Sequence, residues 1–270
     1  MADSLPEQSP QLSQDLLKML EKGSSNDVTI VLEDGEVKAN KDILMARCPY
    51  FATMFSNQNF LEGQNNIVKM MNVQKEPMER VLKFIFSDNM KELVAGNFQT
   101  TIKVLDLLRL LLLDQACTKV EAWLMKVLDG GKMLVDRVLK SYAEEGRRTA
   151  SIVSGLVLLQ KLKFEDLFQK CLDLFCLHME LILNCERERL DFRNIPFDVM
   201  KKMLMNPVGN LSKKMNAFKV WFDYNKEQID EPDKIEILEF QMNFVRETLE
   251  KECGQCKDCD CYNKSKDDDK

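Results

Sequence analysis

Four cysteines near the C-terminus have the residue type and spacing that most directly suggest chemistry. Cys253, Cys256, Cys259 and Cys261 stand close together along the chain. Four thiolates suit zinc or copper(I). Structural zinc sites, however, usually take their ligands from two separated pairs, so that the metal closes a loop. The cluster therefore predicts either a metal-binding tail or, as we favour, a disordered tail that holds no metal.

Catalytic groups are scarce elsewhere in the chain. His178 is the only histidine, which removes the usual general base and the histidine-containing triads. Cys176 lies two residues before it, and side chains at that spacing in a helix point to different faces. Gly130-Gly131-Lys132 lacks the glycine spacing of a phosphate-binding loop. We therefore expect no enzymatic activity, no catalytic residue and no cofactor.

Charge and hydropathy limit the classes of partner. The net charge is −6, which argues against direct nucleic-acid binding. Residues 1–11 are polar, and no apolar stretch approaches the ~20 residues of a membrane span. We therefore expect an intracellular protein, cytoplasmic or nuclear or both, without a membrane partner. Five further cysteines lie in apolar surroundings and are predicted to be small buried residues in a reducing compartment: Cys48, Cys117, Cys171, Cys176 and Cys185.

The order of predicted elements divides the chain into an α+β part and an all-α part. Residues 27–32 form a β-branched run, Asp34-Gly35 is a hairpin signal, and residues 36–39 follow as the partner strand. A third strand is expected at 67–71, and short helices separate the strands. From Lys132 onward only helical patterns follow, at 132–142, 149–160, 164–185, 196–205, 213–227 and 233–250. Gly130-Gly131 is the natural boundary between the two parts.

The α+β part resembles a BTB/POZ domain. The residues that carry the resemblance are DVTIVLEDGEVKANKDILMARCPYFATMF, then FLEG, IVKMMNV and MERVLKFIFSD, and 97–128 resemble the closing helices of that family. One position departs from it, because Asn40 precedes Lys41 where the family usually has histidine. We expect a changed hydrogen bond there and an unchanged fold.

The helical part resembles the BACK domain that often follows a BTB domain. The matching segments are GLVLLQKLKFEDLFQKCLDLF, NIPFDVMKKML and AFKVWFDYN. The predicted organisation is a BTB/POZ domain with its N-terminal dimerisation helix at 1–129, a BACK-like domain at 130–250 and a cysteine-rich, charged tail at 251–270.

The BTB resemblance implies a homodimer. Leu12, Leu16 and Leu20 share one face of a short predicted helix, and so short a helix must dock its apolar stripe on its own chain or on a second copy. The resemblance favours the second copy and adds Ile43 and Leu44 to the interface. It also implies a charged pair, Asp27 and Lys41, at the floor of the dimer. This pair either recruits partners or, as we favour, stabilises the fold and the dimer.

The triplet Phe60-Leu61-Glu62 resembles the hydrophobic-X-Glu signature of BTB domains that bind cullin-3. An apolar anchor and an orienting carboxylate would dominate such a shallow interface. The alternative is a solvated loop whose Phe60 enters the core.

The combined expectation is a dimeric, non-enzymatic adaptor of a cullin-3 ubiquitin ligase that holds an unidentified substrate protein. The alternatives are a BTB scaffold that does not bind cullin-3, with transcriptional or cytoskeletal partners, and a thiol-rich metal or redox sensor.

The last predicted helix has an apolar pattern that fits more than one structure. Ile235, Leu238, Met242, Val245 and Leu249 follow a three-four spacing typical of a coiled coil, but Ile237, Phe240 and Phe244 form a second apolar face. The two faces favour a core helix or a partner groove.

Overall fold

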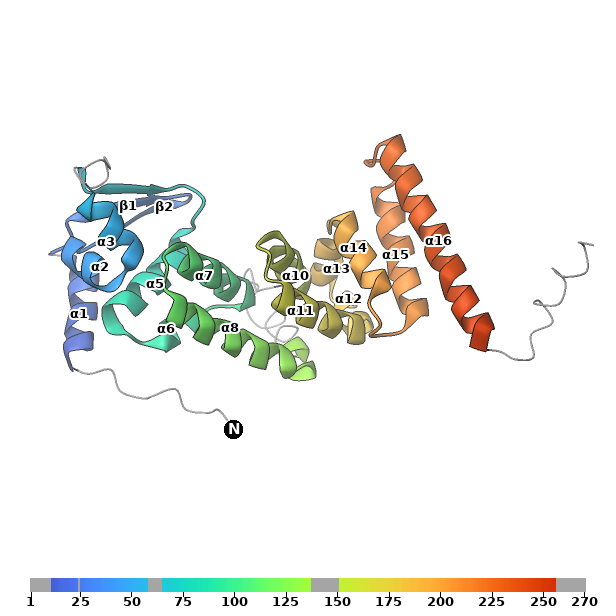
Figure 1. Ribbon diagram of the computed structural model, residues 1–270, viewed down its shortest axis with the longest axis horizontal. Helices are drawn as coiled ribbons and strands as arrows, with labels where there is room; N and C mark the ends of the chain where they lie inside the picture. The colour runs from blue at the N-terminus through green and yellow to red at the C-terminus, as the bar shows by residue number, and fades with distance from the viewer. Residues whose placement is uncertain (1–10, 24, 58–64, 137–150, 256–270) are drawn as a thin grey trace, which may run out of the picture. The chain divides into compact units, whose positions relative to one another are not determined.

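The computed structural model describes residues 11–23, 25–57, 65–136 and 151–255. The chain divides into two compact units, residues 1–215 and 216–270. Within these described residues, the first unit begins with a small sheet and its helices and continues in helices (Figure 1). This confirms the predicted α+β fold followed by a helical part.

The sheet has three strands, β1 (Val28–Leu32), β2 (Gly35–Ala39) and β3 (Ile67–Met70), in the order β2-β1-β3. β1 pairs antiparallel with β2, and Leu32 stands opposite Gly35 across the hairpin turn. β3 runs parallel to β1, which requires a crossover connection between them. Alternate side chains of β1, namely Val28, Ile30 and Leu32, are buried, so one face of the strand forms core.

Helix α1 (Gln11–Lys22) precedes the sheet, and α2 (Lys41–Arg47) and α3 (Pro49–Ser56) follow β2. Four helices complete this part of the chain: α5 (Lys75–Ser87), α6 (Met90–Val94), α7 (Phe98–Leu110) and α8 (Asp114–Asp129). Asparagine side chains cap three of these helices, because Asn40 accepts from the amide of Ile43, Asn89 from that of Lys91 and Asn97 from that of Thr100. The core gathers Phe51, Phe86 and their aliphatic neighbours.

The helical part of the first unit contains α10 (Ile152–Lys161), α11 (Glu165–Leu177), α12 (Met179–Leu183), α13 (Glu186–Arg193) and α14 (Phe197–Met205). It packs directly on the preceding helices, α10 against α7 and α11 against α8. A Cβ atom at Gly155 would stand 2.5 Å from the Phe98 ring, so glycine permits the close approach of α10 to α7. The Arg109 guanidinium also lies 3.7 Å from the Phe164 ring centroid. The predicted domain boundary at Asp129 stays a prediction.

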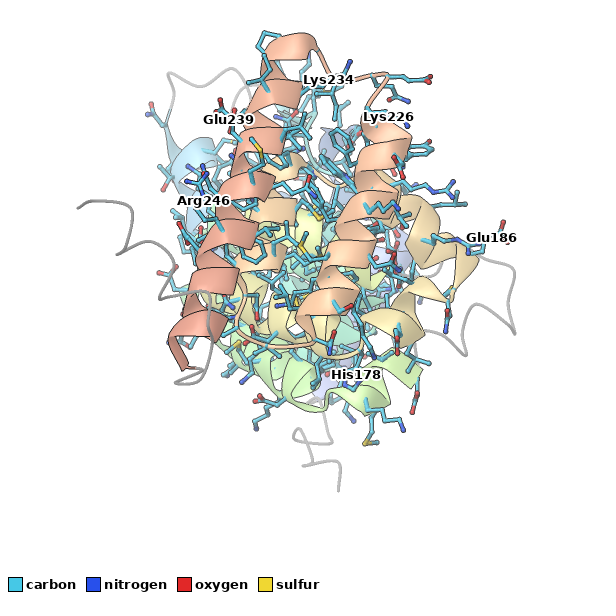
Figure 2. All side chains as sticks on the ribbon, turned by 90° about the vertical axis from the view of Figure 1, so that its right-hand side faces the viewer. His178, Glu186, Lys226, Lys234, Glu239 and Arg246 are labelled. Atoms are coloured by element: carbon cyan, nitrogen blue, oxygen red, sulfur yellow. The ribbon has the colours of Figure 1, made fainter. Side chains whose placement is uncertain are left out.

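Helix α15 (Leu211–Asn225) runs from the end of the first unit into the second, where α16 (Glu231–Gln255) follows. Figures 1 and 2 both show α15 and α16 side by side. Phe218 and Trp221 of α15 are buried, with their ring centroids 6.0 Å apart. Within the part of the chain that the structure describes, none of the helices is both long and apolar enough to cross a bilayer.

Candidate protein-interaction surfaces

The leucine stripe of α1 is only partly covered by its own chain. Helix α1 packs against α5, yet Leu12 is 69% exposed and Leu16 and Leu20 are half-buried. Helix α1 therefore docks on its own chain and still leaves apolar surface open, and its contact with a second copy stays a prediction. That remaining surface is available to a second copy.

The two residues of α2 that were expected in the dimer interface, Ile43 and Leu44, differ in how far they are buried. Ile43 is half-buried, whereas Leu44 is fully buried. Because a side chain enclosed by its own chain offers no surface to another molecule, Leu44 belongs to the core of this domain. The interface that stays a prediction therefore comprises Leu12, Leu16, Leu20 and Ile43.

Asp27 and Lys41 lie together, and a hydrogen bond joins the Lys41 backbone to the Asp27 side chain, while the predicted charged pair stays a prediction. The Asp27 carboxylate is exposed and accepts a hydrogen bond of 2.8 Å from the backbone amide of Lys41, the first residue of α2. A carboxylate there is stabilised by the helix dipole. The Lys41 ammonium donates to the side-chain oxygen of Asn66 at 2.8 Å and lies 5.0 Å from the Phe55 ring centroid.

Asn40 shows how the fold accommodates the departure from the family pattern. Its side-chain oxygen accepts from the Ile43 amide at 3.1 Å, and its side-chain nitrogen donates to the Ser25 carbonyl at 2.9 Å. These contacts cap α2 and attach it to the chain ahead of β1.

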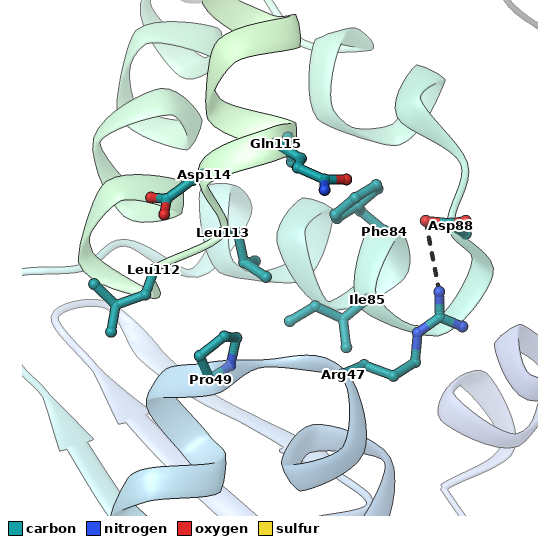
Figure 3. Close-up of a pocket in the computed structure, with 10 residues that line it drawn as sticks. Arg47, Pro49, Phe84, Ile85, Asp88, Leu112, Leu113, Asp114 and Gln115 are labelled. Carbon is teal, nitrogen blue, oxygen red and sulfur yellow. Dashed lines mark ion pairs between the residues drawn. The ribbon is translucent and has the colours of Figure 1, made fainter.

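A pocket of about 350 Å³ opens where α2, α3 and α5 meet the α7–α8 junction (Figure 3). Arg47 and Asp88 form an ion pair of 3.5 Å at one side of it. Leu112 at the other side is 54% exposed and has φ of 58°. This left-handed conformation costs a leucine about 1–3 kcal/mol. The fold therefore holds an exposed apolar side chain in a strained backbone position at the pocket, which is typical of a functional surface.

The predicted cullin-binding triplet, Phe60-Leu61-Glu62, lies outside the described residues. The pocket is nevertheless near it along the chain. Pro49 lines the pocket and begins α3, and α3 ends at Ser56, four residues before Phe60. Sequence patterns did not single out the pocket, and the only signal was the apolar run from Leu110 to Leu113.

A second hollow, of about 390 Å³, lies between the loop after β3, α7 and α10. Lys103 at its wall donates to the side-chain oxygen of Gln74 at 2.7 Å, and Leu110 on its rim is 48% exposed. This hollow is shared by the α+β part and the helical part, so it is a second place where a partner could contact both.

Most of the scattered cysteines are core residues, as expected. Cys48, Cys117, Cys171 and Cys176 are buried, whereas Cys185 is partly exposed. Burial raises the pKa of the Cys176 thiol to about 11 and raises that of Cys171 as well. A buried neutral thiol is a poor nucleophile. His178 is half-buried and lies between α11 and α12.

The predicted metal site lies outside the described part of the chain. Cys256, Cys259 and Cys261 follow the end of α16, and only the backbone of Cys253 is described. Among the described residues, no group of three or more histidine, cysteine or acidic side chains is arranged to hold a metal ion. Metal binding by the tail stays a prediction.

Glu188 on α13 is a buried carboxylate that the sequence patterns missed. It accepts hydrogen bonds from the amides of Ile152 and Val153 at 2.8 and 3.1 Å and from the Ser151 hydroxyl at 2.8 Å. The donors belong to the first turn of α10, so the carboxylate occupies the positive end of that helix dipole. Asp191 accepts a further bond from the Ser154 hydroxyl at 2.7 Å. These contacts bind α13 to α10.

Lys214 at the start of α15 is a second buried charge. Its ammonium donates to the carbonyl of Asn206, and the Asn206 side chain donates to Asp173 of α11 at 2.7 Å. Burial lowers the pKa of Lys214, and the nearby Asp173 carboxylate opposes this shift. This network joins α11 to the α14–α15 connection.

Comparisons with known proteins identify the N-terminal part. Residues 16–123 match the family model described as the BTB/POZ domain. Rho-related BTB domain-containing protein 1 of Mus musculus is 37% identical over 68 residues, 25% of this chain and 10% of that protein. Kelch-like protein 3 of Mus musculus is 30% identical over 91 residues, 34% of this chain and 15% of that protein.

One longer alignment reaches into the helical part. Kelch repeat and BTB domain-containing protein 4 of Pongo abelii is 22% identical over 221 residues, which is 82% of this chain and 37% of that protein. The chain therefore spans about a tenth of the Rho-related relative and little more than a third of this one.

Proposed function

We propose that this chain, whose residues 16–123 form a BTB/POZ domain, is a dimeric substrate adaptor of a cullin-3 RING ubiquitin ligase. BTB/POZ domains are protein-interaction modules, so the chemistry of ubiquitin transfer would belong to the recruited ligase. The observation that carries the proposal is the pocket beside the strained Leu112, at the start of the helix that leads toward Phe60-Leu61-Glu62.

In the proposed interface, the pocket and the triplet would supply different kinds of contact. Phe60 resembles the apolar anchor of the hydrophobic-X-Glu signature, and Glu62 resembles its orienting carboxylate. Leu112 adds an exposed apolar contact, and the Arg47–Asp88 pair adds charge at the rim. A few apolar anchors surrounded by polar contacts dominate interfaces of this kind.

The dimer would use the open stripe of α1 together with Ile43. We expect the chain to have twice its mass of 31.4 kDa in solution. Replacing Leu16 and Leu20 by aspartate should separate the two copies at micromolar concentration, because burying unpaired carboxylates costs several kcal/mol. Light scattering at micromolar concentration measures the mass. A wild-type chain that is monomeric there would contradict the dimer.

The helical part would set the distance and angle between the cullin and a captured substrate protein. Two captured substrates on one dimer would increase avidity. The four buried thiols favour a reducing compartment, and we place the protein in the cytoplasm, the nucleus or both. The resemblance of the helices to a BACK domain supports this arrangement.

A scaffold that dimerises without binding cullin-3 is the alternative function. The partly exposed leucine stripe of α1 supports the scaffold as much as it supports the adaptor, because dimerisation through α1 does not require cullin-3. Titration with cullin-3 separates the two functions, since only the adaptor binds it.

A further inference from the structure

Helix α16 carries two apolar faces, and the structure distinguishes them. Ile237 is buried at 3% exposure, and the rings of Phe240 and Phe244 stack with centroids 6.1 Å apart. The other face is open, since four large apolar side chains are 56%, 43%, 61% and 37% exposed: Ile235, Leu238, Met242 and Val245. We call these four residues the α16 seam.

The seam has the spacing of a coiled coil. Its members are separated by three, four and three residues, which places Ile235 and Met242 at a positions and Leu238 and Val245 at d positions of two heptads. A β-branched residue at a followed by leucine at d favours a two-stranded parallel pair. The first layer of the seam, Ile235 and Leu238, has this composition.

One pair of residues beside the seam, Lys234 and Glu239, is complementary in charge to a second copy of the helix. Lys234 and Gln241 take the g positions, and Glu239 and Arg246 take the e positions. Figure 2 shows Glu239 and Arg246 along one edge of α16 and Lys234 toward the other.

A parallel, in-register pair would set Lys234 against the second copy's Glu239 and Gln241 against its Arg246. An antiparallel pair centred on the same four seam residues would instead set Glu239 against its own counterpart. The charges therefore favour the parallel arrangement.

We propose that the α16 seam pairs with the α16 seam of a second copy of this chain, as a parallel two-stranded coil. Two heptads give a short contact, and short helices associate weakly on their own, so we expect the pairing to depend on protein concentration. The tail of this chain does not fit the seam, because residues 256–270 contain no aliphatic side chain. The inference rests on α16 alone and does not depend on cullin-3 or on dimerisation through α1.

Cross-linking in the full chain tests the parallel register. The starting protein has Cys253, Cys256, Cys259 and Cys261 changed to serine, so that tail thiols do not contribute. Met242→Cys places a thiol on the seam, and Asn243→Cys places one beside it at another exposed position. After mild oxidation we expect a disulfide-linked dimer, reversed by reductant, from Met242→Cys and at least about tenfold less from Asn243→Cys. Equal yields from both variants, or none from either, would overturn the proposal.

The mass in solution gives a second, independent readout. In a chain carrying Leu16→Asp and Leu20→Asp, we expect the mass to rise from 31.4 kDa toward twice that value with concentration. Adding Met242→Glu should weaken this association at least about tenfold, because two carboxylates would be buried against each other. A mass that does not respond to Met242→Glu would overturn the pairing and leave the proposed adaptor function untouched.

Discussion

Replacing Glu188 by alanine is expected to lower the free energy of unfolding by at least ~3 kcal/mol. The substitution removes the acceptor for two amides and one hydroxyl at the start of α10. These donors are buried, and each one left unpaired costs about 1–3 kcal/mol. Urea denaturation followed by circular dichroism measures the loss.

Two further variants make this result specific. Glu186 lies on the same helix and is exposed, so Glu186→Ala should change stability by no more than about 0.5 kcal/mol. Glu188→Gln retains one acceptor oxygen and should fall between the wild type and Glu188→Ala. Equal stability of the Glu186 and Glu188 alanine variants would show that the buried carboxylate does not hold α13 to α10.

The second large effect is expected on cullin-3 affinity. Phe60→Ala removes the apolar anchor and Glu62→Ala removes the orienting carboxylate, and each should weaken binding by ~1–3 kcal/mol, about tenfold or more. Calorimetry measures the affinity, with the mass and the melting temperature of each variant as controls. If Phe60→Ala lowers the melting temperature while Glu62→Ala leaves the affinity unchanged, the loop is structural and the adaptor proposal loses its main support.

A substitution at the pocket, whose residues the structure describes, extends the same experiment. Asparagine tolerates the left-handed conformation better than leucine, so Leu112→Asn should keep or raise stability while it removes exposed apolar surface. Cullin-3 binding should weaken. Leu177→Asn is the matched control, because Leu177 is a similarly exposed leucine at the end of α11. Equal effects of the two variants would show that the pocket has no special role.

Local signals predicted the sheet and the first helices. The β-branched run of β1 and the Asp34-Gly35 turn each determine structure over a few residues, and the structure has both strands there. The short helices expected between the strands are present as α2 and α3. Asn40 was expected to change a hydrogen bond without changing the fold, and it caps α2.

Features that depend on distant residues were not predictable. Helix α13 has a highly charged sequence, ERERLDFR, and its buried Glu188 contacts donors more than thirty residues away. Hydrophobic periodicity cannot detect such a contact. A helix as short as α2 also gives too little periodicity to show that Leu44 rather than Ile43 faces the core. Nothing in the Leu110–Leu113 run indicates that Leu112 adopts a left-handed conformation.

For α16, the sequence contained both apolar faces but could not rank them. The face that begins at Ile235 and the face that begins at Ile237 were equally apparent in the sequence. Together they favoured a core helix or a partner groove. Only the packed structure shows that Ile237 is buried and Ile235 exposed. Burial thus leaves one heptad seam open, and this is why the seam became the basis of a separate proposal.

Titration of the wild-type chain with the N-terminal part of cullin-3, followed by calorimetry, tests the central claim most directly. The account predicts saturable binding at one cullin per chain, by a protein whose mass is twice 31.4 kDa. The stoichiometry follows because each copy would present its own pocket and its own Phe60-Leu61-Glu62. No binding by a well-folded dimer would contradict the adaptor function and leave the cullin-independent scaffold in its place.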